Sequence, residues 1–249
     1  ASSSLRSSRS TSATKYANVS SFQLRLSPPP SSDVRGGFLC EMMGLGKTIS
    51  TLALVRAHPP PAVPLSSAEA AAAWGELNPA AAATRHAKTG TVRSGATLVV
   101  CPVSLVTQWY DEACSKLTEM GKQTGYRYYG STRKRDALEI AKYDIVVTTY
   151  AVLASDWRGK RRVNAKTGEF AAGSESDASW EPGPLQQVHW WRIVLDESHA
   201  IKSSSTQIFK AVCTLETVAG GSRWCVTGTP VTTTLKDLLT QLKSQLLHN

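Results

Sequence analysis

Short apolar runs alternate with stretches of helical periodicity along much of the chain. The runs lie at residues 37–40, 96–102, 143–150, 191–195 and 223–227. The run at 96–102, Ala-Thr-Leu-Val-Val-Cys-Pro, is of the kind buried on both faces of a parallel sheet. Because helical patterns separate the runs, the alternation predicts a single α/β domain with a mainly parallel central sheet.

Three segments interrupt this alternation. Residues 1–33 are rich in Ser, Arg and Pro, and only 16–26 could form a strand, so we expect a flexible tail. Residues 58–95 contain three consecutive prolines and two blocks of four alanines, and residues 155–187 are rich in Ser, Gly and Pro. Such compositions offer little large apolar surface to offset the entropy of ordering. We therefore expect the domain to span residues 34–249, with irregular insertions at 58–95 and 155–187.

A Gly-rich loop follows the first apolar run and opens a helical pattern at 47–56. Its residues are Gly44, Leu45, Gly46, Lys47 and Thr48. Glycines let the main chain approach phosphates, and the N–H groups of a helix N-terminus point toward them. In such a loop the Lys47 ammonium contacts the β- and γ-phosphates, and the Thr48 hydroxyl is a ligand of Mg²⁺. The strand-loop-helix context favours phosphate binding over a chance match. Glu41 stands where the general pattern has its first Gly, which argues against small GTPases and nucleotide kinases.

An acidic pair follows another predicted strand. Asp196 and Glu197 come directly after residues 193–195, and parallel sheets place ligands at the carboxyl ends of their strands. Asp196 suits a contact to Mg²⁺ through water, and Glu197 suits general-base activation of the attacking water. His199 is a candidate relay, although a lone histidine is more often structural. Two acids could also simply cap the next helix, but a phosphate loop in the same sheet favours catalysis.

A Gly/Pro turn follows the last apolar run and presents two hydroxyls. Thr227 and Thr229 flank Gly228 just before Pro230. By itself the string predicts only a turn. Its order after the phosphate loop and the acidic pair indicates that the two threonines sense the γ-phosphate and couple it to the rest of the domain.

Composition narrows the class of partner. The chain has 28 Lys and Arg against 19 Asp and Glu, a net charge of +9, which favours an anionic partner such as nucleic acid or a polyphosphate. Its five cysteines form no C-x-x-C pair, so we expect reduced thiols in an intracellular protein. No run approaches the roughly 18 apolar residues that cross a bilayer, so no membrane partner is expected.

Taken together, these strings resemble the Snf-type branch of the superfamily 2 helicase-like ATPases. Residues 35–48 look like the family's motif I, and residues 99–109 are similar to motif Ia. Residues 144–150 look like the next strand and its Thr-Thr-Tyr, residues 196–202 resemble motif II, and residues 223–230 resemble motif III. The resemblance covers about residues 34–245. The insertions and the Pro-rich lead look most like the subgroup of post-replication repair factors.

The resemblance implies a three-layer RecA-like P-loop NTPase lobe that binds ATP and Mg²⁺. It also implies that motif Ia and the Thr-Thr-Tyr segment hold one DNA strand by its backbone, with Ser104, Thr148 and Thr149 as donors. The expected partner is double-stranded DNA, the expected location is the nucleus, and the expected process is DNA repair or chromatin remodelling with proteins of those pathways.

Three departures from the family bear on activity. Met42 replaces the usual acidic residue of motif I, and Thr232 and Thr233 replace the common Gln-Asn after motif III, but no group assigned to ATP or Mg²⁺ is lost. We expect the second RecA-like lobe to be missing, because this sequence shows no counterpart to it. Its arginines complete the catalytic site, and an arginine supplied from outside raises such rates by about 10³ to 10⁵. We therefore expect this chain to bind ATP and, without that lobe, to hydrolyse it weakly.

Other interpretations remain open at this point. The chain could be a nucleotide-binding fragment or scaffold without motor activity. RNA unwinding by a DEAH-type enzyme fits the motif I and Ia strings less well than DNA translocation does. The basic runs at 133–135 and 158–162 could contact phosphates, but such runs more often form a solvated face or a nuclear-import signal.

Overall fold

The computed structural model describes residues 16–18, 23–25, 35–60, 91–117, 125–157, 183–231 and 235–246. The chain divides into two compact units, residues 1–34 with Asn249 and residues 35–248. In the first unit, β1 (Tyr16–Asn18) pairs antiparallel with β2 (Gln23–Arg25). The single strand expected within residues 16–26 is therefore a pair of strands, and the rest of the predicted tail lies outside the described residues.

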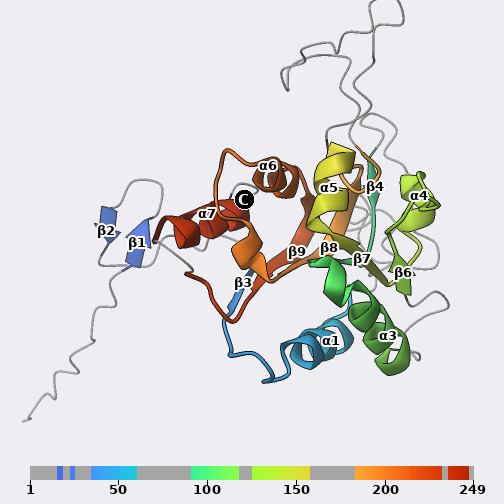
Figure 1. The fold of residues 1–249 in the computed structure, drawn as a ribbon, viewed down its shortest axis with the longest axis horizontal. Helices are drawn as coiled ribbons and strands as arrows, with labels where there is room; N and C mark the ends of the chain where they lie inside the picture. Colours follow the sequence, from blue (N-terminus) through green and yellow to red (C-terminus); the bar gives the residue numbers. More distant parts are fainter. Residues whose placement is uncertain are drawn as a thin grey trace, which may run out of the picture. The chain divides into compact units, whose positions relative to one another are not determined.

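The larger unit is built on a seven-stranded sheet with strand order β3-β9-β8-β5-β7-β6, in which β4 also pairs with β8. All strand pairings in this sheet are parallel, as the alternating pattern predicted (Figure 1). The strands are β3 (Gly36–Leu39), β4 (Val92–Arg93), β5 (Thr97–Cys101), β6 (Gly125–Arg127), β7 (Ile145–Thr149), β8 (Val188–Asp196) and β9 (Glu216–Val226).

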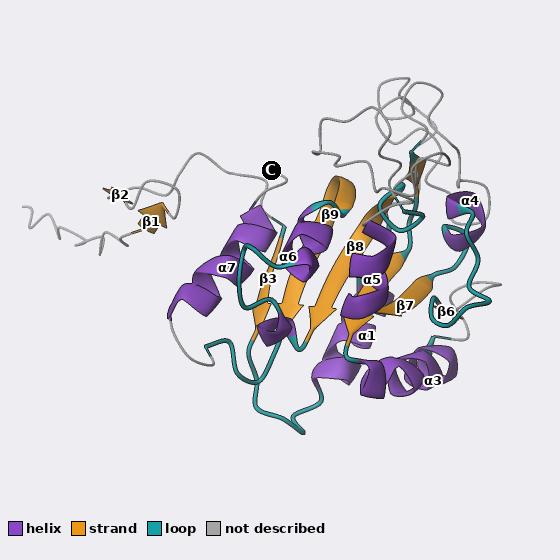
Figure 2. Ribbon diagram, turned by 45° about the horizontal axis from the view of Figure 1, so that its top comes forward, coloured by secondary structure: helices purple, strands orange, loops and turns teal. Residues whose placement is uncertain are grey.

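Helices cover both faces of this sheet, which gives the predicted three-layer arrangement (Figure 2). One face carries α1 (Lys47–Ala57) and α3 (Val106–Lys116). The other face carries α5 (Tyr150–Trp157) and α6 (Gln207–Cys213), and α6 packs with α7 (Leu235–Leu246). Shorter pieces are α4 (Ala137–Ile140) and the 3-10 turns η1 (Val103–Leu105) and η2 (Ser198–Ala200). In the part of the chain described, no helix has the length and apolar character that crossing a membrane requires.

The central strands are buried on both faces, because successive side chains of a strand point to opposite sides. In β5, Leu98 and Val100 join the core beneath α5 and α6, whereas Val99 and Cys101 join the core beneath α1 and α3. All residues of this strand are buried. The continuous apolar pattern of β5 therefore results from burial on both faces of the sheet, as the sequence predicted.

Local boundaries differ from the predicted ones at two helix starts. After β5 the turn η1 comes first, and α3 begins after Leu105 without a side-chain cap. Ser104 is exposed within η1. Tyr150, predicted to end a strand, instead begins α5, where its large side chain is buried.

The described residues that flank the two predicted insertions lie near β8, toward the end of the sheet where its strands begin. After α1, the carbonyl of His58 accepts a hydrogen bond of 2.8 Å from Nη2 of buried Arg192. On the far side of that interruption, β4 lies within the segment expected to be irregular, yet it pairs with the first residues of β8. After α5, Gly183 packs so closely on Asp156 that a Cβ at Gly183 would lie 2.6 Å from the Asp156 carbonyl oxygen. Most of the two predicted insertions lies outside the described residues.

Gly36 provides a test of the close packing between β3 and β9. Its φ is +123°, and a Cβ there would lie 1.8 Å from the carbonyl oxygen of Arg223. Gly36→Ala should therefore lower the free energy of unfolding by about 3 kcal/mol, because main-chain atoms must move apart. Gly130→Ala is the control, since Gly130 has a φ of +85° but no atom within 4 Å of the added Cβ. It should cost only about 1 kcal/mol. Urea unfolding followed by circular dichroism measures the free energy of unfolding of both variants. Equal losses would contradict the close packing of Gly36 against β9.

Candidate active site

The register of the sheet brings the predicted motifs to one edge. Leu39 and Asp196 are both register partners of Val226, and Cys101 is the partner of Thr149. The loops after β3, β5, β7, β8 and β9 therefore begin at the same level of the sheet. Figure 2 shows these carboxyl ends together, with the loop before α1 running beneath them.

The phosphate loop has the backbone that its glycines permit. Gly44 and Gly46 have φ values of 84° and 80°, a left-handed region that residues with a Cβ avoid. Gly46 is the N-cap of α1, so the free N–H groups of the first turn face the loop. The Lys47 ammonium donates to the carbonyls of Glu41 at 3.0 Å and Met42 at 3.1 Å. The cation is thus held against the loop, and Leu45 lies exposed on it.

Asp196 ends β8 with both carboxylate oxygens held. Trp109 Nε1 donates to Oδ2 at 2.7 Å, and the N–H of Glu197 donates to Oδ1 at 2.9 Å. The Tyr150 hydroxyl donates to the Asp196 carbonyl at 2.8 Å. The pKa of Asp196 is raised, because burial outweighs the two hydrogen bonds to its carboxylate and the charge of Lys47, which lower the pKa. Each carboxylate oxygen keeps a lone pair for a further donor such as a metal-bound water.

Glu197, His199, Thr227 and Thr229 form a cluster beside this carboxylate. Glu197 Oε2 lies 3.0 Å from His199 Nδ1. The same nitrogen lies 3.2 Å from Thr227 Oγ1 and 3.5 Å from Thr229 Oγ1. The structure therefore joins the predicted base, the relay and both coupling threonines. Thr227 is fully buried and Thr229 is exposed.

Glu197 has two properties suited to a base. Its φ of 49° is the only positive value among the non-glycine residues described. Such a conformation costs about 1 kcal/mol and, outside turns and caps, collects at functional sites. Its Oε2 is buried and accepts no hydrogen bond of good geometry, although His199 lies beside it. Among the described residues, no well-aligned donor therefore occupies the lone pairs of this oxygen.

The oxygen donors fit Mg²⁺ bound together with a nucleotide. The described residues contain no group of three or more His, Cys, Asp or Glu side chains placed to hold a metal. Mg²⁺ in nucleotide sites needs no such cage, because one or two protein oxygens, phosphates and water complete its octahedron. The Asp196 carboxylate and the Thr48 hydroxyl, on the first turn of α1, are donors of this kind.

Gln241 connects the acidic motif to the Gly/Pro turn, a role that no pattern in the sequence indicates. Ser198 Oγ donates to Gln241 Oε1 at 2.7 Å, and Gln241 Nε2 donates to the Pro230 carbonyl at 2.8 Å. Ser198 and Gln241 are fully buried. One amide on α7 therefore fixes the distance between two active-site loops.

Arg223 is a second residue whose role was missed. It is buried in β9, and its guanidinium donates to the carbonyls of Val212 at 3.1 Å and Ser244 at 2.9 Å, and also to that of Leu215. Burial lowers the pKa of Arg223 to about 10. It ties the ends of α6 and α7 to β9, the strand that directly precedes Thr227.

The residues predicted to contact DNA differ in access. Ser104 is exposed in η1. Thr148 is fully buried, and its hydroxyl donates to the Tyr128 carbonyl at 3.0 Å. Thr149 is also buried, and its Oγ1 accepts from the N–H of Val152 at 3.1 Å at the start of α5. Direct contact through the Thr148 side chain would require this hydroxyl to leave its partner and become exposed.

The basic run at 133–135 is engaged within the protein. Arg133 Nη2 lies 3.0 Å and Arg135 Nη1 lies 3.2 Å from Oδ1 of buried Asp156. Lys134 Nζ donates to the Tyr143 hydroxyl at 3.0 Å. This run is therefore not a purely solvated face. The second basic run, 158–162, and Thr232 and Thr233 lie outside the described residues.

Comparisons of the sequence with known proteins agree with the resemblance that the motifs indicated. A family model described as the SNF2-related domain matches residues 10–247. The chain is 34% identical over 229 residues to the DNA repair protein RAD5B of Arabidopsis thaliana, covering 91% of the chain and 16% of that protein. It is 35% identical over 216 residues to the DNA repair protein rad8 of Schizosaccharomyces pombe, covering 84% of the chain and 16% of that protein. The chain thus spans about a sixth of the length of these relatives.

A solved structure supports the fold. The Sulfolobus solfataricus SWI2/SNF2 ATPase core in complex with dsDNA superposes with a TM-score of 0.51 at 26% sequence identity. The match covers 84% of this chain and 31% of that one. The predicted RecA-like layering and the resemblance to Snf-type ATPases are confirmed.

The Gln241 bridge generates a stability prediction. Gln241→Leu keeps the side-chain size but leaves the Ser198 hydroxyl and the Pro230 carbonyl without their buried partner. The free energy of unfolding should fall by about 2 kcal/mol. Gln207→Leu, at an exposed position of α6, should change it by less than about 0.5 kcal/mol. Thermal and urea unfolding give both values, and a neutral Gln241→Leu would show that the bridge does not hold the loops together.

Proposed function

The chain belongs to the SNF2-related domain family, and on that premise we propose that it is the ATP-binding first lobe of a DNA-dependent, helicase-like motor ATPase. One observation carries the proposal. The acidic pair ending β8 and the Thr227 turn ending β9 meet in direct contact through His199. The phosphate loop begins at the same edge, because β3 pairs in register with β9. This arrangement suits hydrolysis of a nucleoside triphosphate more than simple phosphate binding.

Each residue then has one role toward ATP. The main chain of Gly44, Leu45 and Gly46 holds the phosphates. Lys47 exchanges its contacts with loop carbonyls for the β- and γ-phosphates, while Thr48 and Asp196 provide oxygens for Mg²⁺. The ion, when bound, neutralises charge that develops on the phosphates. These interactions bind and orient the nucleotide.

Glu197 accepts a proton from the attacking water, and His199 relays the change to the threonines. The contact of Glu197 Oε2 with His199 Nδ1, at 3.0 Å, supports the role of general base. His199 Nδ1 lies within 3.5 Å of both Thr227 Oγ1 and Thr229 Oγ1. Displacement of the γ-phosphate would therefore change the contacts of His199 with these two hydroxyls. The catalytic set that we propose is Lys47, Asp196, Glu197 and His199.

The lobe works with a second RecA-like lobe that supplies arginines to the nucleotide. The chain covers only 31% of the solved ATPase core, which leaves room in such proteins for further domains. Without external arginines we propose that hydrolysis is slow, because they contribute about 10³ to 10⁵ in rate in related phosphoryl transfers.

Duplex DNA is the proposed polymer partner. The solved neighbour is a complex with dsDNA, the net charge of +9 attracts phosphates, and Ser104 offers an exposed hydroxyl and main chain after β5. Relatives named DNA repair proteins support a role in repair or chromatin remodelling in the nucleus, with proteins of those processes as further partners.

A nucleotide-binding scaffold without motor activity is the second candidate. Two of the three predicted DNA-binding hydroxyls, on Thr148 and Thr149, are buried and bonded within the domain. The ATP site alone is compatible with a scaffold. Stimulation of hydrolysis by DNA distinguishes the two functions.

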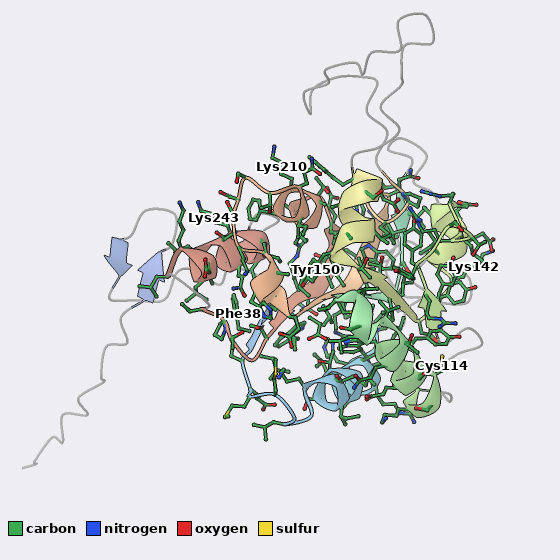
Figure 3. All side chains as sticks on the ribbon, in the orientation of Figure 1. Phe38, Cys114, Lys142, Tyr150, Lys210 and Lys243 are labelled. Carbon is green, nitrogen blue, oxygen red and sulfur yellow. The ribbon has the colours of Figure 1, made fainter. Side chains whose placement is uncertain are left out.

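Lys47→Ala tests the phosphate loop. Loss of a charge-assisted contact to the phosphates should weaken binding of ATP with Mg²⁺ about 10- to 100-fold. Lys210→Ala is the matched control, because this lysine is exposed on α6, far from the loop before α1 (Figure 3). Calorimetric titration of both variants measures the affinities. Undiminished binding by Lys47→Ala would overturn the assignment of the loop.

Glu197→Gln separates binding from hydrolysis. With the second lobe joined to this domain, duplex DNA should stimulate hydrolysis, and the variant should bind ATP normally while losing about 10² to 10⁴ in rate. Glu139→Gln, whose side chain on α4 is partly exposed, should retain both properties. Phosphate release is measured with duplex DNA, duplex RNA or neither. ATP binding without stimulation by DNA would favour the scaffold, and stronger stimulation by RNA would favour RNA unwinding.

A further inference from the structure

The indole of Trp109 reaches from the helix layer to the acidic motif. Trp109 lies on α3 with 1% of its surface exposed, and its Nε1 donates to Asp196 Oδ2 at 2.7 Å. This distance lies at the short end of the range for hydrogen bonds from a nitrogen donor. Tryptophan has a single polar group, so its whole hydrogen-bonding capacity is directed to Asp196.

Packing leaves this indole little freedom to move. Trp109 shares a core cluster with Leu52 and Val55 of α1 and with Val194 of β8. The first turn of α1 carries Lys47, so the packing that fixes the indole belongs to the helix that follows the phosphate loop. Interiors are close-packed, and a rotated indole would leave a cavity and an unpaired carboxylate oxygen.

The two donors to Asp196 act on opposite carboxylate oxygens. Trp109 holds Oδ2, and the N–H of Glu197 holds Oδ1 at 2.9 Å. A carboxylate with one donor can turn about its last bond, whereas two donors on different oxygens fix its plane. Metal-binding carboxylates commonly depend on such outer hydrogen bonds for their orientation.

We propose that Trp109 is a positioning residue for the metal, which orients the Asp196 carboxylate toward Mg²⁺ bound with ATP. The proposal rests on the function proposed above, in which Asp196 contacts that ion. Trp109 touches neither the nucleotide nor the ion. It acts through Asp196, so its removal should weaken Mg²⁺ binding and leave contacts between ATP and the phosphate loop intact.

Trp109→Phe and Trp190→Phe form a matched pair for the test. Trp190 is also fully buried, and its Nε1 donates at 3.1 Å to the carbonyl of Leu185, before β8 begins. Each variant loses one indole N–H and the same side-chain volume from the core. ATP affinity is measured by calorimetry over a Mg²⁺ titration and again in EDTA.

Trp109→Phe should raise the Mg²⁺ concentration needed for tight ATP binding about 10- to 100-fold. Its ATP affinity in EDTA should equal that of the wild type, and Trp190→Phe should match the wild type in both conditions. Equal effects of the two variants, or no effect of either, would overturn the positioning role. Absence of ATP binding by the wild-type chain would instead overturn the proposed function.

A measurement on the unaltered chain does not depend on the variants folding. The assigned indole N–H resonances of Trp109 and Trp190 are followed by NMR with a non-hydrolysable ATP analogue. Addition of Mg²⁺ to the bound analogue should shift the Trp109 resonance and leave that of Trp190 in place. An unmoved Trp109 resonance would contradict the proposal.

Discussion

The parallel register of the sheet is the constraint on which the candidate active site depends. Strands that run in one direction and end at one level deliver their following loops to a common edge. Leu39, Asp196 and Val226 end three neighbouring strands in register. Motifs separated by more than 150 residues therefore meet without any long loop reaching across the domain. Tyr150 lies near the middle of the larger unit in Figure 3, where its hydroxyl donates a hydrogen bond to the main-chain carbonyl of Asp196.

Buried polar side chains then fix this edge at finer scale. Arg223 has no carboxylate among its hydrogen-bond partners and is satisfied by carbonyls at the ends of helices, where the helix dipole is negative. Gln241 spans two loops with its two amide atoms. Trp109 and the Glu197 main chain share the oxygens of Asp196. Each contact is costly to leave unmade inside the protein, so together they select one arrangement of the loops.

The sequence predicted the elements whose patterns are local. Apolar runs predicted β3, β5, β7, β8 and β9, and the glycines at 44 and 46 predicted the phosphate loop. The strand β6, with the pattern Gly-Tyr-Arg, has no apolar run to mark it and is held by pairing with β7. The roles of Gln241 and Arg223 depend on contacts with residues 8 to 43 positions away. The sequence also did not predict the burial of Thr148, because a Thr-Thr pair at a strand end is compatible both with buried hydroxyls and with hydroxyls that contact a ligand.

The two edges of the sheet tolerate change differently. At the amino edge, His58 is held by Arg192, β4 pairs with β8, and Gly183 packs on Asp156, so the described residues that flank the two predicted insertions are fixed to the domain. The closure entropy of a connecting segment rises only slowly with its length. Evolution can therefore lengthen or replace sequence at this edge while the geometry on the opposite edge is inherited unchanged. Sequence changes at the amino edge of the sheet therefore need not disturb the residues of the candidate site at the carboxyl edge.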